Sequence, residues 1–128
     1  MKKLLIVEDT MTIPTLIKVY LMGWDLEFHH ARDGVEGLKM ARELKPDLIL
    51  SDVQMPGMDG FELCAQVRAD KELYQVPIVL LTSLKDDASR RKGTLVGATA
   101  FLSKPVMVDE LRERLGALLK VQPKVPNR

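Results

Sequence analysis

Five short apolar runs alternate with amphipathic stretches along the chain, and this alternation predicts an α/β fold with a mostly parallel sheet. The runs are Leu4–Val7, Leu26–Phe28, Leu48–Leu50, Ile78–Leu81 and Thr99–Leu102. The first, third and fourth runs are almost entirely apolar, as strands covered by helices on both faces must be. The second run contains or adjoins Glu27, His29 and His30, and the fifth run is short. We therefore place the second and fifth strands at the edges of the sheet.

The stretches between the runs carry apolar residues at helical spacing, which predicts helices with one buried face. The repeating positions are Ile13, Leu16, Ile17, Tyr20 and Leu21, then Val35, Leu38 and Ala41, then Phe61, Cys64 and Val67, and finally Val108, Leu111, Leu115, Leu118 and Leu119. Asp33, Asp59 and Asp109 stand near the predicted helix starts, where a carboxylate accepts hydrogen bonds from free N–H groups. The stretch Asp86–Val96 predicts the weakest helix, because its middle, Ser89–Thr94, offers little to bury.

The length and the composition are those of one globular domain. The chain has 128 residues, of which 46% are hydrophobic and 29% are charged, and a chain of this length can bury an adequate core. We expect residues 1–120 to form a single domain. Residues 121–128 contain two prolines and have a linker-like composition, so we expect a short tail or the start of a linker there.

The net charge and the cysteine content limit the classes of binding partner and the cellular compartment that we expect for the protein. The formal net charge is +1, without the basic excess of nucleic-acid-binding modules, and we interpret the run Arg90–Lys92 as a solvated helix face. Cys64 is the only cysteine, so we interpret it as a core residue in a protein of a reducing compartment. The first apolar run is too short for a signal peptide or a membrane span. We therefore expect a cytoplasmic protein that binds no membrane and no nucleic acid directly.

Polar side chains stand at the ends of four of the five runs. Glu8 and Asp9 follow the first run, Asp52 closes the third, Thr82 closes the fourth and Lys104 follows the fifth. Because parallel strands all end on one edge of a sheet, we expect these groups to meet at a single rim. If the strand order is 2-1-3-4-5, the first and third strands are neighbours, and the three carboxylates face one another.

Three carboxylates at close range repel one another, since two unit charges about 4 Å apart cost about 4 kcal/mol at an effective dielectric constant near 20. A cation is therefore expected at the rim, and hard oxygen ligands in an open cleft favour magnesium. Lys104 supplies a second positive charge. In this setting Asp52 is held ionised as a nucleophile, and Thr82 donates its hydroxyl to an incoming phosphoryl oxygen. The pattern indicates transfer of a phosphoryl group to a carboxylate.

Four motifs give the sequence a specific resemblance to a known family. They are Leu-Leu-Ile-Val-Glu-Asp (4–9), Leu-Ile-Leu-Ser-Asp-Val-Gln-Met-Pro-Gly-Met-Asp-Gly (48–60), Ile-Val-Leu-Leu-Thr-Ser (78–83) and Phe-Leu-Ser-Lys-Pro (101–105). Over residues 1–120 the chain resembles the response regulator receiver domains of two-component signalling, of the chemotaxis type. The resemblance implies one flavodoxin-like, doubly wound (βα)5 domain with strand order 2-1-3-4-5.

The resemblance also implies roles for the rim residues. Asp52 would receive the phosphoryl group from a sensor histidine kinase or a histidine phosphotransfer protein. Asp9 and Asp52 would bind Mg²⁺ directly together with the backbone carbonyl of Gln54, and Glu8 would act mainly through water. Such a domain is not a classical enzyme, because it catalyses only its own phosphorylation and dephosphorylation.

Two further residues take part in the switch that the resemblance implies. Thr82 and Lys104 would contact the phosphoryl oxygens, and Phe101 stands where the family has an aromatic switch residue, often tyrosine. Phenylalanine lacks the hydroxyl, so an output contact through that group is not available. The fourth helix, fifth strand and fifth helix would bind a downstream protein, and the domain would be a monomer or a phosphorylation-dependent homodimer.

Several alternatives remain beside this interpretation. An aspartyl-phosphate phosphatase of the haloacid dehalogenase type also uses an aspartate at a strand end, but it needs a second acid where this sequence has Gln54. A flavodoxin-like cofactor binder would need a Gly- or Ser/Thr-rich loop after the first run. A degenerate receiver would act only as an interaction module, which the intact rim residues argue against. His29 and His30 point to opposite faces of a strand, so we interpret them as ordinary edge-strand histidines.

Overall fold

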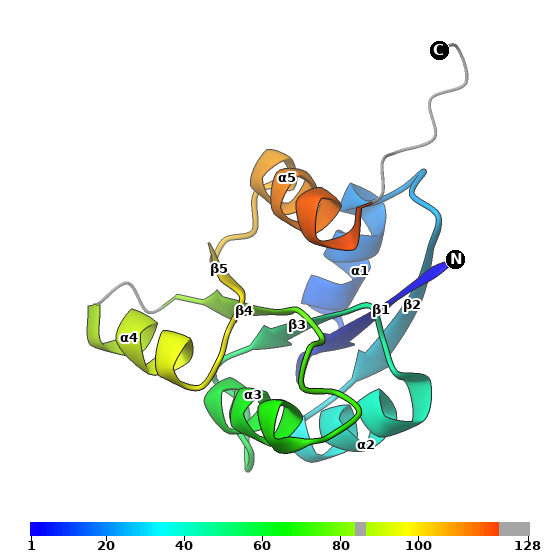
Figure 1. The fold of residues 1–128 in the computed structure, drawn as a ribbon. Coiled ribbons are helices and arrows are strands. Elements are labelled where there is room, and N and C mark those ends of the chain that lie inside the picture. The colour runs from blue at the N-terminus through cyan, green and yellow to red at the C-terminus, as the bar shows by residue number, and fades with distance from the viewer. Residues whose placement is uncertain (84–86, 121–128) are drawn as a thin grey trace.

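The computed structural model describes residues 1–83 and 87–120, in which five strands alternate with five helices, as the apolar runs predict (Figure 1). The strands are β1 (Lys2–Val7), β2 (Leu26–Ala31), β3 (Leu48–Asp52), β4 (Ile78–Thr82) and β5 (Ala100–Ser103). The helices are α1 (Thr12–Tyr20), α2 (Gly34–Leu44), α3 (Gly60–Ala69), α4 (Asp87–Leu95) and α5 (Val108–Leu119). The predicted tail, residues 121–128, lies outside the described residues.

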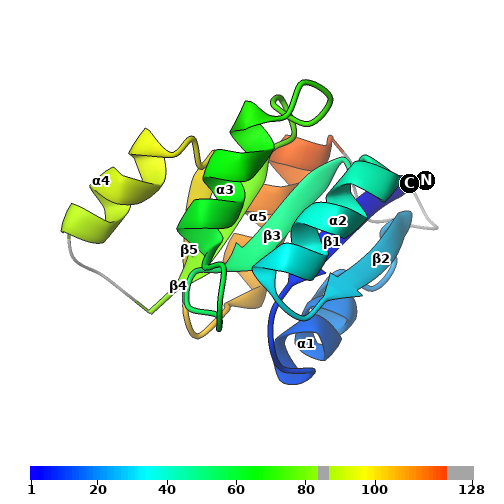
Figure 2. The same ribbon diagram turned by 90° about the horizontal axis from the view of Figure 1, so that it is seen from below.

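The five strands form one parallel sheet in the order β2-β1-β3-β4-β5 (Figure 2). The order confirms the flavodoxin-like prediction, and β2 and β5 are the edge strands. The central strands β3 and β4 are buried along their whole length. Because β1 and β3 are direct neighbours, with Val7 opposite Ser51, the residues that follow both strands are brought to the same rim.

Helices cover both faces of the sheet and enclose two separate cores. α1 and α5 lie on one face, whereas α2 and α3 lie on the other (Figure 1). Along β1 the side chains alternate between the two cores: Leu4 and Ile6 belong to the α1/α5 side, Leu5 and Val7 to the α2/α3 side. This is the period of two that a strand covered on both faces must show. The sheet is therefore held from both sides, and its rim is fixed in place.

The helix starts confirm two of three predicted caps. The Asp33 carboxylate accepts a hydrogen bond from Glu36 N, and the Asp59 carboxylate accepts one from Glu62 N, each at 2.8 Å. The prediction for Asp109 is wrong, because α5 begins at Val108 and Asp109 lies inside its first turn. At that position a carboxylate still interacts favourably with the helix dipole, but it does not cap the helix.

α4 is the least embedded helix, as its polar middle predicts. Gly93 is its only buried residue, and the helix stands at the β5 edge of the fold (Figures 1 and 2). The cationic run is exposed but is more than a solvated face. The Arg90 guanidinium lies 5.5 Å from the centre of the Phe101 ring, and the Lys92 ammonium lies 4.9 Å from that of Phe61. Two of the three cations therefore cover aromatic rings.

No helix within residues 1–83 and 87–120 is long and apolar enough to cross a membrane.

Cys64 is buried on α3 without a disulfide partner, as predicted for a core cysteine. Tyr20 and Trp24 pack into the core beside the end of α1.

Candidate phosphoacceptor and metal site

The three predicted carboxylates meet at the carboxyl ends of β1 and β3. One carboxylate oxygen from each of Glu8, Asp9 and Asp52 lies within 4.8 Å of the other two. Glu8 and Asp52 are buried, with 2% and 5% of their surface exposed, whereas Asp9 is open to solvent. The neighbouring placement of β1 and β3 therefore brings together residues more than forty positions apart in the chain.

Lys104 reaches the same group from the end of β5. Its ammonium nitrogen lies 2.9 Å from Asp52 Oδ1. The backbone N–H of Lys104 donates to the carbonyl oxygen of Thr82 at 3.0 Å, which ties the end of β5 to the end of β4. Thr82 is buried at that position, and the peptide bond from Lys104 to Pro105 is cis. Asp52 is thus flanked by two carboxylates and one ammonium group.

Glu8 lies in an environment that disfavours its negative charge. Its Oε1 accepts a hydrogen bond from the Thr10 hydroxyl at 3.1 Å. Its Oε2 is buried and has no hydrogen-bond partner among the described residues. Burial above all, and then the negative charge of Asp52, raise the pKa of Glu8 to about 7. Without a metal ion, the site therefore destabilises the charged form of Glu8.

Without a metal, we expect the protein to become more stable as the pH falls from about 8 to about 5. In the folded protein the pKa of Glu8 is about 7, whereas in the unfolded chain this carboxyl titrates at its ordinary, lower pKa. The folded state therefore binds the proton more tightly, and the resulting stabilisation is lost as the pH rises through the folded pKa. Thermal midpoints of the wild type and of Glu8→Gln, measured across this range in EDTA, test the expectation.

The glutamine variant isolates the contribution of Glu8, since His29 and His30 are present in both proteins. We expect the wild type to lose stability relative to Glu8→Gln as the pH rises. Parallel pH profiles for the two proteins would show that the proton on Glu8 does not contribute.

The donor set fits a hard divalent cation. It offers carboxylate oxygens from three residues, one of them the buried Glu8 Oε2 that lacks a protein partner. Such oxygens are the ligands that Mg²⁺ takes in open sites, where it also keeps several waters. Gln54, two residues after β3, has an exposed side chain. The role of its backbone carbonyl as a metal ligand stays a prediction.

The structure adds two residues to the site that were not predicted, Ser51 and Gly60, and it gives His30, interpreted from the sequence as an ordinary edge-strand histidine, a contact with Glu8. The ring nitrogen Nε2 of His30 lies 2.7 Å from the backbone oxygen of Glu8, so this histidine supports the acidic pair from β2. His29 contacts Glu27 instead, at 2.8 Å. The Ser51 hydroxyl donates to the backbone oxygen of Asp52 at 2.8 Å. The side-chain alternation along β2 separates the two histidines as predicted, but it gives no sign of the contact with Glu8.

Gly60 is the second of these unpredicted residues. A Cβ atom at this position would lie 2.4 Å from the backbone oxygen of Asp52 and 2.9 Å from Val53 Cα. The glycine therefore allows the start of α3 to pack directly against the end of β3. The Asp59-Gly60 pair at a helix start was a signal for this close approach, although the partner of the glycine follows only from the tertiary structure.

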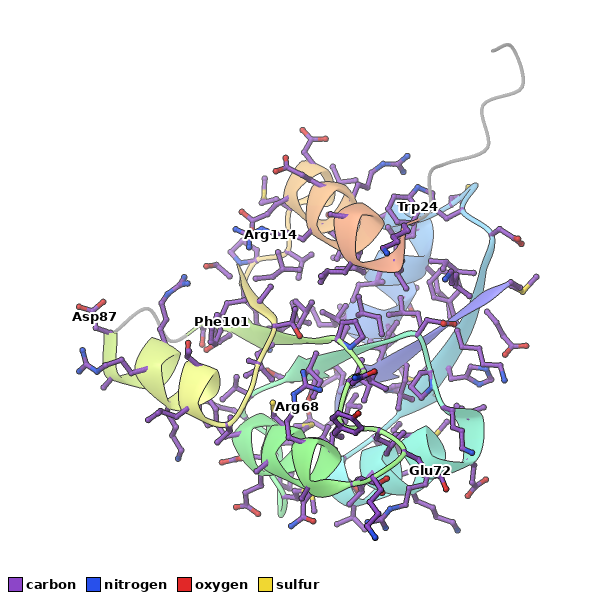
Figure 3. All side chains as sticks on the ribbon, viewed as in Figure 1. Trp24, Arg68, Glu72, Asp87, Phe101 and Arg114 are labelled. Atoms are coloured by element: carbon purple, nitrogen blue, oxygen red, sulfur yellow. The ribbon has the colours of Figure 1, made fainter. Side chains whose placement is uncertain are left out.

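Phe101 lies on β5 beside α4, where its ring packs against Gly93 (Figure 3). A Cβ atom on Gly93 would come within 2.4 Å of the ring atom Cζ. Phe101 is opposite Leu80 in the register, and Thr82 follows two residues later on the same face. The ring therefore connects α4 with the strand that ends at the acidic site.

Comparisons with known proteins agree with this geometry. The family model of the response regulator receiver domain matches residues 4–116. The transcriptional regulatory protein AfsQ1 of Streptomyces coelicolor is 39% identical over 120 residues, which make up 94% of this chain and 52% of AfsQ1. The chain spans about half the length of this and other curated relatives that it matches.

Solved structures of similar size also share the fold. The Vibrio cholerae chemotaxis protein CheY4 is 35% identical with a TM-score of 0.86, and the match covers 92% of this chain and 98% of that one. The receiver domain of the Pseudomonas aeruginosa sensor histidine kinase PA1611 carries a magnesium ion in its active-site cleft. It is 27% identical, with a TM-score of 0.84 over 93% of this chain and 98% of that one. By sequence, fold and acidic cluster, the chain belongs to the response regulator receiver domain family, a family of phospho-accepting signalling switches rather than classical enzymes.

Proposed function

We propose that Asp52 is the residue that accepts the phosphoryl group, with Glu8 and Asp9 as its metal-binding neighbours. The observation that carries this assignment is the environment of Asp52, which is buried, within 4.8 Å of two other carboxylates and 2.9 Å from the Lys104 ammonium. A salt bridge that served only stability would not need two further acids beside it. The arrangement instead suits a site that receives an anionic group together with a cation.

The reaction follows from the position of these groups. An Asp52 carboxylate oxygen attacks the phosphorus of a phosphohistidine on the kinase. The phosphorus–nitrogen bond breaks, and the imidazole leaves with the electron pair and takes up a proton. Lys104, already paired with Asp52, then contacts a phosphoryl oxygen, and the Thr82 hydroxyl donates to another. The product is an acyl phosphate on Asp52, which water later hydrolyses.

We propose magnesium as the cofactor, since the PA1611 receiver domain holds this ion in its cleft. Asp9, Asp52 and the backbone carbonyl of Gln54 would bind it directly, and Glu8 would act mainly through water. When bound, the ion neutralises charge on the carboxylates and on the transferring group. Asp9 is the exposed member of the cluster, so it is the ligand that an entering ion meets first.

Membership of the family implies a histidine kinase partner. We propose that the output partner binds the face formed by α4, β5 and α5, because Phe101 connects that face with the β4 strand that ends at Thr82. Whether phosphorylation also produces a homodimer stays a prediction. So does the chemotaxis type, because the relatives include transcriptional regulators as well as CheY4.

The test is phosphorylation by a small donor. With Mg²⁺ and acetyl phosphate, the full chain should acquire a hydroxylamine-labile phosphoryl group on Asp52, and EDTA should prevent it.

Asp9→Ala should weaken Mg²⁺ binding by at least about tenfold, because a direct ligand is lost. Labelling of this variant should then need a correspondingly higher Mg²⁺ concentration. Its thermal midpoint in metal-free buffer should stay the same or rise, since charge repulsion relaxes.

Asp25→Ala provides the matched control. Asp25 is exposed and directly precedes β2, at the opposite edge of the sheet from the acidic site. We expect this variant to bind Mg²⁺ and to be labelled like the wild type. Labelling that persists in EDTA, or that falls on another residue, would refute the assignment.

A further inference from the structure

Arg68 holds together two loops, the α3–β4 connection and the α4–β5 connection. It lies near the end of α3 (Figure 3). Its guanidinium donates four hydrogen bonds. Nε donates to Gly97 O at 2.9 Å, Nη1 to Tyr74 O at 2.9 Å and to Val76 O at 2.6 Å, and Nη2 to the Thr99 hydroxyl at 3.3 Å. One side chain therefore ties the α3–β4 connection to the α4–β5 connection.

The chain directly after α4 is shaped to fit this side chain. Gly97 has φ +97°, and a Cβ atom there would lie 2.8 Å from Arg68 Cγ. Glycine is therefore required both for the backbone conformation and for the packing of the arginine stem. Thr99 is held twice, because its hydroxyl also accepts a hydrogen bond from Ile78 N at 3.0 Å.

Cys64 adds a contact at the same place. Its thiol donates to the carbonyl oxygen of Val96 at 3.3 Å. Burial raises the pKa of Cys64 to about 11, so the thiol keeps its proton at neutral pH and remains a donor. Cys64 and Arg68, which lie one turn apart on α3, thus both bind the backbone segment that follows α4.

The remainder of α4 is attached differently. Gly93 is the only buried residue of the helix and faces the ring of Phe101, over which Arg90 also lies, while the Lys92 ammonium lies over the ring of Phe61 on α3. In the proposed switch this ring is the part that moves. The end of α4 is therefore fixed by hydrogen bonds from α3 side chains to its backbone, whereas the buried position of the helix body rests on a ring that the switch moves.

We propose that Arg68 is a positioning residue that makes the C-terminal end of α4 a pivot, so that phosphorylation of Asp52 turns the helix about residues 96–99. The inference rests on the proposed function and specifies how the output face moves. A nine-residue helix is about 13 Å long, so a turn of about 10° moves its Asp87 end by about 2 Å while the pivot stays in place. The partner would then sense the movement mainly at the N-terminal half of α4.

Amide hydrogen exchange of the full chain, with and without Mg²⁺ and beryllofluoride, tests the pivot. Beryllofluoride serves as a phosphoryl mimic on Asp52. In the wild type, exchange should change in residues 87–93. The amides of Gly97, Ala98 and Thr99 donate to backbone oxygens of Thr94, Gly93 and Ile78, respectively. Their rates should stay within about twofold, because the pivot keeps the local hydrogen bonds intact.

Arg68→Met keeps the aliphatic stem but removes all four hydrogen bonds. Exchange at residues 96–99 should become about tenfold faster or more, and the response to beryllofluoride should spread into this segment. Labelling of Asp52 by acetyl phosphate should stay within about threefold of the wild-type rate, because none of the four Arg68 hydrogen bonds goes to a residue of the acidic site. Arg68→Lys restores a single donor nitrogen in place of the three-nitrogen guanidinium and should give an intermediate result.

Arg42→Met is the matched control, since Arg42 also holds a loop through a single exposed contact, to Asp70 at 3.1 Å. It should leave residues 96–99 unchanged. If beryllofluoride alters residues 96–99 of the wild type as much as residues 87–93, the helix moves as a whole and the pivot is refuted, although phosphorylation stands. If the wild type is neither labelled nor altered by beryllofluoride, the proposed function fails and the pivot fails with it.

Discussion

Replacing Asp52 with asparagine is expected to reduce labelling by acetyl phosphate to less than about 1% of the wild-type rate. The amide has nearly the same shape as the carboxylate, but it carries no negative charge and is not a nucleophile toward phosphorus. It also offers the Lys104 ammonium no charged partner at the 2.9 Å position. The measurement is the amount of hydroxylamine-labile phosphoprotein formed over time at saturating Mg²⁺.

Asp59→Asn is the matched control for this variant. Asp59 stands seven residues further along, and its carboxylate caps α3 by accepting a hydrogen bond from Glu62 N at 2.8 Å. Asparagine caps helices about as well as aspartate does, so this variant should fold and be labelled normally. Equal labelling of Asp52→Asn and the wild type would refute the assignment of Asp52, whereas loss in both variants would point to a general defect of the β3–α3 region.

Much of the fold could be predicted because the sequence pattern is local and regular. The continuous apolar runs identify β1, β3 and β4 as strands covered on both faces, and the polar residues in β2 identify an edge strand. Parallel strands end on one side, so Asp9, Asp52 and Lys104 were expected to meet once the strand order was specified. The predicted site needed the strand ends, the charges and the strand order. The sequence carries the first two directly, whereas the order came from the family resemblance.

Contacts between distant elements could not be predicted in the same way. The support of Glu8 by His30, and the fit of Gly97 to Arg68, depend on which loops become neighbours after folding. The wrong prediction of a cap at Asp109 has a different cause, because helix boundaries shift by one or two residues without changing the apolar pattern. Gly93 shows both limits at once. From the sequence it is a residue of low helix propensity, whereas in the structure it is the contact surface for Phe101.

We expect phosphorylation to alter the position of α4, and a substitution at Gly93 should produce the same change without phosphate. When Thr82 moves to meet a phosphoryl oxygen, Phe101 is expected to turn inward along the face that it shares with Leu80 and Thr82. The ring then leaves Gly93, and the buried position of α4 loses its aromatic contact. Adding Mg²⁺ and beryllofluoride should therefore change amide exchange within residues 87–95, with much smaller changes in α1.

Gly93→Ala should shift the unphosphorylated protein toward this state. The new methyl group would lie 2.4 Å from Phe101 Cζ, so the ring must move away. The resulting exchange pattern of α4 should resemble that of the wild type with beryllofluoride, and the further response to beryllofluoride should shrink by about half or more. The same substitution made together with Phe101→Leu should have a much smaller effect, because the shorter side chain leaves room for the methyl group.

Helix propensity is the competing explanation, since alanine stabilises a helix interior by about 1 kcal/mol relative to glycine. Thr94→Ala separates the two causes. Thr94 is exposed and its hydroxyl donates only to Arg90 O, at 3.0 Å, so alanine there raises helix propensity without touching Phe101. If Thr94→Ala shifts α4 as Gly93→Ala does, propensity and not the ring controls the helix. If beryllofluoride instead alters residues 11–22 and leaves α4 unchanged, the signal leaves the site by α1, and the output face lies there.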